Sequence, residues 1–170
     1  MQKLKVSRCV CIGGILTALA VLFQSAPVFL PGVGLALSPL STLPIAMAAI
    51  INISLGLTVF FSSVLILTFV SVQESIILLF TTGLLGITLG ISLNRKGNLI
   101  SILHSGAALS LGMLCLTYIV GVPAFAELTE TVSAPIIFLA FILFSLAYSS
   151  IWNICIRKFM NRMIKIKWNG

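Results

Sequence analysis

Hydrophobic residues fill most of this chain, and short polar interruptions divide them into runs. The runs are 9–26, 40–72, 76–93, 99–120 and 132–156. A helix that crosses a bilayer needs about 20 apolar residues, so most of these runs are long enough for one span. The pattern predicts an all-α polytopic membrane protein that forms a single domain over residues 1–170.

The run 40–72 contains 33 residues and no charge, which is too long for one span and short for two. Topology decides between these possibilities. The N-terminal basic cluster and Arg95-Lys96 should both lie in the cytoplasm, so an even number of spans must separate them. We therefore predict two short spans, 40–54 and 56–72, with a turn around Asn52–Gly56. The complete layout has six spans with both termini cytoplasmic.

Composition and charge agree with this layout. With 59% hydrophobic residues, 8% charged residues and a mean hydropathy of +1.23, a soluble domain is excluded. The net charge is +7, but all ten basic residues fall on the predicted inner side and all three acids on the outer side. The basic residues therefore indicate topology and not nucleic-acid binding. We expect a multi-pass protein of the plasma membrane of a bacterial cell, surrounded by membrane lipids.

The basic C-terminal segment has two interpretations. After residue 156, apolar and basic residues alternate so that a continued helix could rest in the membrane interface beside anionic headgroups. A simple stop-transfer tail explains the same residues, and we favour it.

One apolar stretch is poorly suited to a span. Residues 26–44 contain four prolines and two glycines, which interrupt a helical hydrogen-bond ladder. Irregular backbone at membrane depth needs protein or a watery cavity to satisfy its polar groups. We predict an irregular outer loop that folds back over a pocket, with Pro31, Gly32 and Gly34 near the ligand.

Glu74 is the acid closest to this predicted pocket. It is either a solvated loop residue or a residue that faces the cavity. No Lys or Arg of the chain is predicted on the outer side, so in the cavity either a ligand is its partner or the carboxyl stays protonated. Several other polar residues fall at the same predicted depth. The candidate ligand-binding residues are Gln24, Pro31, Gly32, Gly34, Ser41, Thr42, Gln73, Glu74 and Tyr118.

Small residues mark two candidate packing faces. Gly14 and Ala18 form a small-xxx-small pair in the first span, which lets another helix approach closely. Thr82, Gly86 and Gly90 recur every four residues on one stripe of the fourth span. We predict that this second stripe packs against a neighbouring helix.

Catalytic chemistry has little support in the sequence. Metal-ligand spacings, nucleophile motifs and phosphate-binding loops are not found, so we expect no enzymatic activity, no cofactor and no metal. The four cysteines are interpreted as small apolar fillers. His104, the one histidine, is expected to be structural, bonding a neighbouring helix or reaching the interface.

The layout resembles the substrate-binding S components of energy-coupling factor (ECF) transporters. The features shared are the length, six spans, inner termini, a small-residue first helix and a long apolar first outer loop. The segment S-T-L-P-I-A-M-A-A-I-I from Ser41 also resembles bacterial membrane families related to S components.

The resemblance implies capture of a vitamin or similar micronutrient from outside. It further implies docking through the first helix on a transmembrane coupling subunit driven by two cytoplasmic ATPases. Gly14-x-x-x-Ala18 is the nearest match to the alanine-xxx-alanine docking motif of that family, and residues 26–44 match its gating loop. The alternative is a non-catalytic structural or assembly subunit of a larger membrane complex, without a ligand.

Overall fold

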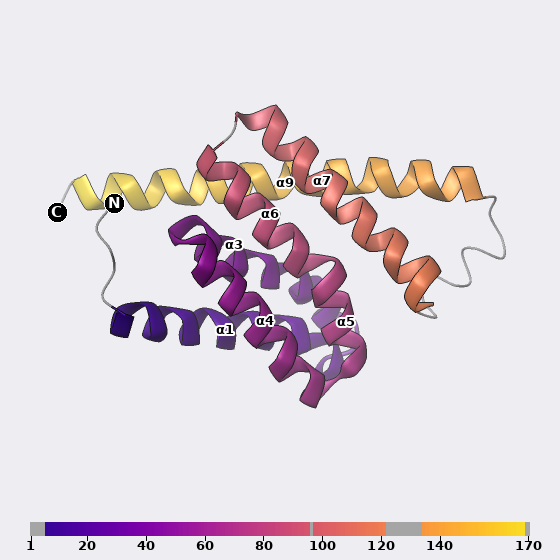
Figure 1. The fold of residues 1–170 in the computed structure, drawn as a ribbon, viewed down its shortest axis with the longest axis horizontal. Helices are drawn as coiled ribbons and strands as arrows, with labels where there is room; N and C mark the ends of the chain where they lie inside the picture. The colour runs from indigo at the N-terminus through magenta and orange to yellow at the C-terminus, as the bar shows by residue number, and fades with distance from the viewer. Residues whose placement is uncertain (1–5, 96, 122–133, 169–170) are drawn as a thin grey trace.

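The computed structural model describes the backbone of residues 6–95, 97–121 and 134–168 (Figure 1). Side chains are described up to Met160, except those of Asn94 and Arg95. Throughout these ranges the secondary structure is helical and contains no strand. The prediction of an all-α fold is confirmed for this part of the chain.

The chain runs back and forth through the bundle, and some passes consist of two or more consecutive helices (Figure 1). The helices are α1 (Val6–Phe29), α2 (Val33–Leu37), the 3₁₀ helix η1 (Ser38–Ser41), α3 (Thr42–Ile51), α4 (Ile53–Val70), α5 (Val72–Phe80), α6 (Thr82–Arg95), α7 (Asn98–Cys115), the π-helical turn η2 (Leu116–Val120) and α9 (Ala134–Trp168). Six segments are long and apolar enough to cross a membrane: Val6–Phe29, Val33–Ile51, Ile53–Val70, Val72–Leu93, Asn98–Val120 and Ala134–Met160. They indicate a multi-pass membrane protein.

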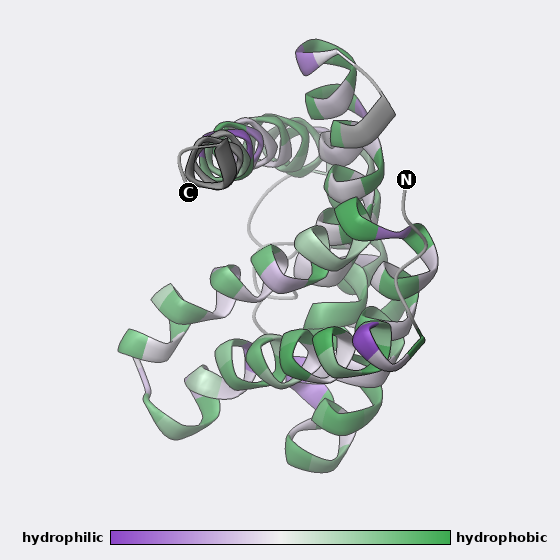
Figure 2. Ribbon diagram, turned by 90° about the vertical axis from the view of Figure 1, so that its left-hand side faces the viewer, coloured by the Kyte–Doolittle hydropathy of each residue, from purple (hydrophilic) through white to green (hydrophobic). Residues whose placement is uncertain are grey.

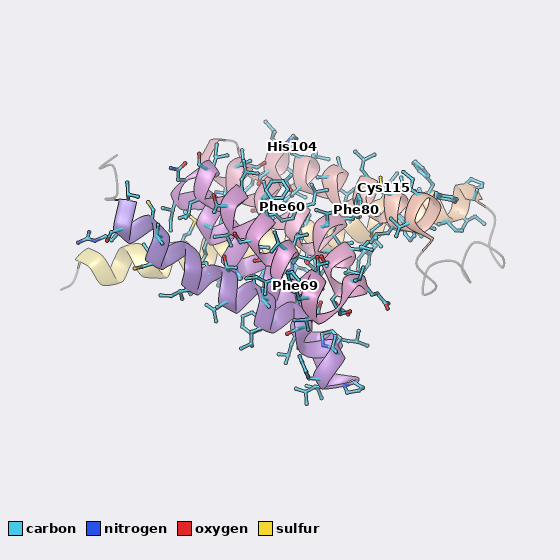
Figure 3. The ribbon with its side chains drawn as sticks, turned by 60° about the horizontal axis from the view of Figure 1, so that its bottom comes forward. Phe60, Phe69, Phe80, His104 and Cys115 are labelled. Carbon is cyan, nitrogen blue, oxygen red and sulfur yellow. The ribbon has the colours of Figure 1, made fainter. Side chains whose placement is uncertain are left out.

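The outward surfaces of these helices are apolar, as expected in lipid. Hydrophobic residues cover most of each helix in Figure 2. On α4, Phe69 is 85% exposed, whereas Phe60, on the same helix, is 5% exposed and belongs to the core (Figure 3). In water such exposure of large apolar side chains would be unfavourable, but a lipid environment covers them.

The predicted irregular loop over residues 26–44 is wrong for most of its length. Only Leu30–Gly32 lie outside helices, with Gly32 at a positive φ of 90°. Pro27 lies in the last turn of α1, Pro39 at the start of η1 and Pro44 in the first turn of α3. Proline is tolerated in a first helical turn because its missing N–H has no intrahelical acceptor there. These prolines therefore sit at helix ends, where they do not prevent the segment Val33–Ile51 from being a candidate span.

The predicted turn in the long apolar run is found, but it is shorter than expected. Asn52 alone is extended, with φ −158° and ψ 135°, and its side chain accepts a hydrogen bond of 3.1 Å from the backbone N–H of Ser54. This cap starts α4 at Ile53, earlier than the predicted start at Gly56. Gly56 instead permits close contact with α3, since a methyl group added to it would lie 2.6 Å from the Cα of Ala49.

The fourth span begins earlier than predicted and is interrupted. Glu74, predicted to lie between spans, is in the first turn of α5, where Ser71 caps the helix. The helical run breaks at Thr81, whose φ is −117° and ψ is −89°, and continues as α6. The candidate span Val72–Leu93 is thus interrupted at Thr81, whereas Val33–Ile51 stays helical throughout and tightens to a 3₁₀ turn at η1.

The predicted stripe on the fourth span is confirmed as a packing face. A methyl group on Gly86 would lie 3.0 Å from the Cβ of Ile45, and one on Gly90 would lie 2.5 Å from the Cβ of Ala49. Both contacts join α6 to α3. At such separations the two backbones approach more closely than any larger residue would allow.

The two ends of the bundle differ in charge. Figure 1 shows the start of α1, the turn between α3 and α4, the end of α6 and the last turns of α9 at one end. This end carries Arg8 and the basic residues Arg157 and Lys158. Glu74 lies at the opposite end, near the turn between α4 and α5. By the positive-inside rule the Glu74 end is expected to face outward, and we refer to it below as the outer end.

The C-terminal helix does not bend after the basic residues begin. It is a single helix of 35 residues, which corresponds to about 52 Å at 1.5 Å per residue, so it extends well past a hydrocarbon core. Figure 1 shows it as one straight rod.

Candidate functional site

A network of hydrogen bonds centred on Gln24 lies at the outer end. Gln24 is 0% exposed, as is Ser41, and Thr82 is 8% exposed. The Oε1 atom of Gln24 accepts hydrogen bonds from the Ser41 hydroxyl at 2.8 Å and the Thr82 hydroxyl at 3.0 Å. Its Nε2 donates to Oε2 of Glu74 at 2.8 Å. These four residues are called the Gln24 network below.

The network forms where the 3₁₀ turn η1 and the interruption at Thr81 meet α1. Gln24 shares the buried face of α1 with Gly13, Thr17 and Ala20, at helical spacing. Ser41 is the last residue of η1, and Thr82 is the first residue of α6. Interrupted helices in membrane proteins are tolerated where other groups satisfy the freed backbone, and their ends are frequent binding sites.

The carboxylate fixes how the Gln24 amide is oriented. An ionised Glu74 can only accept hydrogen bonds, so the donating Nε2 must face it. The amide oxygen then faces the two hydroxyls, and both must donate. The Gln24 side chain is thereby held by three contacts from three different elements, and it holds Glu74 at a defined place.

Glu74 is half-buried, and its charge has little compensation from the part of the chain that the structure describes. Gln24 is the one hydrogen-bond partner of its carboxylate among the described side chains. The position of Glu74 in the first turn of α5 favours negative charge, because helix N-termini carry partial positive charge. The described cationic side chains Arg8, Arg157 and Lys158 belong to the opposite end of the bundle.

Only part of the predicted ligand set comes together. Gln24, Ser41 and Glu74 join in the network, together with Thr82, which the sequence indicated only as a packing residue. Gln73, Pro31, Gly32 and Tyr118 are exposed, and Gly34 is buried against the backbone of Ala26. Thr42 is buried on α3 and is not part of the network.

An apolar groove accompanies the segment 26–44. It encloses about 620 Å³, is open to the surroundings and lies between α1, the α1–α2 turn, α2 and α4. Its lining residues are Ala18, Val21, Leu22, Ser25, Ala26, Phe29, Leu30, Leu37 and Ile66. Gln24 is not among them, so the polar network and the apolar groove use different faces of α1.

The predicted docking residues lie on the outward surface of α1. Gly14 and Ala18 are exposed, and a methyl group on Gly14 would meet no atom within 4 Å. Ala18 also lines the apolar groove. This surface is therefore open to another helix or to lipid.

A second polar cluster joins α7 to α9 near the basic end. Asn153 donates from Nδ2 to the Ser101 hydroxyl at 2.9 Å and accepts at Oδ1 from Nε of Arg157 at 3.0 Å. Ser105 and Ser149 share a hydrogen bond between their hydroxyls. Polar contacts of this kind link helices in a membrane, so we assign the cluster to helix association.

The remaining reactive side chains are scattered. Cys9, Cys11, Cys115 and Cys155 are free, and His104 is exposed on α7 without a hydrogen bond to a described residue (Figure 3). Among the described residues, no three His, Cys, Asp or Glu side chains lie close enough together to hold a metal.

No protein-family model, curated protein or solved structure matches this chain.

Proposed function

We propose that the chain is a substrate-capture membrane subunit of an ECF-type importer. It binds a vitamin or a similar small micronutrient at the outer end and catalyses no reaction itself. The observation that carries this proposal is the Gln24 network, built where the interrupted span Val72–Leu93 and the 3₁₀ turn η1 meet α1.

Interhelical hydrogen bonds also stabilise the fold, so the network by itself does not distinguish binding from packing. A break in a spanning helix and several buried polar side chains are unfavourable in a bilayer, because each polar group must find a partner. A binding role accounts for their gathering at one place and for a carboxylate without a cationic partner among the described residues.

The exposed small residues of α1 supply the docking surface. Gly14 and Ala18 allow close approach of a helix from the coupling subunit, whose two cytoplasmic ATPases drive import. Small residues at a helix surface favour close packing of another helix, and at this surface the described chain supplies no such helix.

The direct test is purification of the chain from its native membrane in a mild detergent. Mass spectrometry should recover a membrane coupling subunit, two ATPases and a retained small molecule. Recovery of folded protein with neither the subunits nor a small molecule would refute the proposal.

Substitution tests the docking surface separately. Gly14→Leu and Ala18→Leu should reduce recovery of the coupling subunit, because a leucine prevents close helix approach. Ala107→Leu is the matched control, since Ala107 is an exposed alanine on α7. Equal recovery with all three variants would exclude docking through α1.

A structural or assembly subunit is the second candidate, and one observation favours it. A methyl group on Gly34 would collide with the backbone carbonyl of Ala26, so the start of α2 is packed tightly against α1. Gln24 and Ser41 are also completely buried. The space around the network is therefore occupied by the chain's own residues. Co-purification of a stable membrane complex without ATPases or small molecule would support this candidate.

A further inference from the structure

Glu74 is the one described acidic side chain, and its environment restricts what can bind there. We infer that the ligand carries an organic cationic group, such as an ammonium, which pairs with the Glu74 carboxylate. This inference rests on the proposed function, because it names the chemical class of the captured molecule.

The carboxylate is placed by groups that cannot easily move. Gln24 holds Oε2 at 2.8 Å, and Gln24 is itself fixed by two buried hydroxyls on η1 and α6. The second carboxylate oxygen has no hydrogen bond to a described residue. A donor from outside the chain can therefore reach a pre-positioned acceptor without rearranging the helices.

Charge balance favours a cationic donor over a neutral one. A half-buried carboxylate is unfavourable as an anion unless its charge is paired, or it takes up a proton. Within the described ranges, the cationic side chains lie at the opposite end of the bundle. A positive group on the ligand supplies both the missing hydrogen bond and the missing charge, and hydrogen bonds to charged groups are the stronger kind.

The geometry favours an organic cation over a metal ion. Ca²⁺ takes about 6–8 oxygen ligands, and Mg²⁺ demands near-octahedral coordination. The network offers one carboxylate, since the Gln24 oxygen already accepts two hydrogen bonds and is buried. An ammonium needs only one or two acceptors and can keep its remaining contacts to water or to the rest of the ligand.

The test measures thermal unfolding of the full chain in an uncharged detergent, with n-butylammonium chloride as the probe. Sodium chloride controls for ionic strength and n-butanol for the apolar tail. A ligand that binds only the folded protein raises the unfolding temperature with its concentration. We expect saturable stabilisation by butylammonium and none by the two controls.

A pair of variants assigns the effect to Glu74. Glu74→Gln removes the charge and keeps the shape. The double variant Gln73→Glu/Glu74→Gln exchanges two neighbouring side chains and preserves the composition and net charge, but it puts the carboxylate at the exposed position 73. Both variants should bind butylammonium at least about tenfold more weakly, the loss expected for a hydrogen bond to a charged group. Size-exclusion chromatography and the unfolding profile without probe confirm that each variant is folded.

Several outcomes would overturn the inference. These are no stabilisation of the wild-type chain, equal stabilisation of the wild type and the exchanged variant, or Glu74-dependent stabilisation by CaCl₂ or MgCl₂ in place of butylammonium. If the purified complex contains the ATPases and a neutral or anionic molecule, the inference of a cationic ligand is refuted and the proposed function stands. If butylammonium binds through Glu74 but the subunits are never recovered, the proposed function fails and the cation site stands.

Discussion

Replacing Gln24 with leucine tests whether the network holds the outer end together. The substitution conserves approximate size but removes one donor and one acceptor that serve Ser41, Thr82 and Glu74. The two hydroxyls can turn back to carbonyls of their own helices, so each loses about 0.6 kcal/mol, the average for interhelical bonds in a membrane. The contact with the carboxylate is worth about 1.5–3 kcal/mol.

The substitution also stabilises the fold to a smaller extent, because leucine is more apolar than glutamine. Burying the more apolar leucine returns on the order of 1 kcal/mol. The loss of hydrogen bonds therefore wins, and the free energy of unfolding should fall by about 2–3 kcal/mol after this offset. Gln73→Leu is the matched control, because Gln73 lies beside Glu74 on α5 but is exposed. Its effect should stay within about 0.5 kcal/mol.

The assay is equilibrium unfolding in mixed micelles with a rising mole fraction of dodecyl sulfate. Fluorescence of Trp152, which is 8% exposed and packs in the core with α7, reports loss of the fold. If Gln24→Leu and Gln73→Leu change the free energy of unfolding equally, the network does not stabilise the outer end and the reasoning fails.

Four further substitutions test the contacts between helices and the cap of α4. Gly90→Leu should prevent α3 and α6 from packing and destabilise the chain by at least about 1–3 kcal/mol. Gly14→Leu should leave the unfolding transition of the isolated chain unchanged, because Gly14 is exposed and a Cβ there would meet no atom within 4 Å; similar transitions for the two variants would contradict the close contact. Asn153→Leu should weaken the association of α7 with α9, seen as faster proteolysis between them, and intact protection would count against the polar link with Ser101. Asn52→Ala should remove the cap of α4 and lower the free energy of unfolding by about 1 kcal/mol, and a neutral result would show that the turn needs no cap.

The departures from the sequence-based layout have identifiable causes. Prolines and glycines in residues 26–44 predicted irregular backbone, but their position relative to helix ends decides whether they break a helix or begin one. The break at Thr81 escaped prediction because the short segment T-T-G at 81–83 carries no charge or proline and lies between strongly apolar residues. Thr82 was missed as a site residue because its stripe with Gly86 and Gly90 fully explained it as a packing residue.

The sequence by itself determined the all-helical class, the six apolar segments, the turn at Asn52 and the stripe on the fourth span. These features follow from hydropathy, segment length and helical spacing, which are local along the chain. Only the tertiary structure decided that Gln24 meets Ser41, Thr82 and Glu74, residues that lie 17 to 58 positions from it. Such a meeting depends on how helix ends are placed in space, and no local pattern encodes that placement. The same placement put the apolar groove and the polar network on different faces of α1, where the sequence had predicted one pocket.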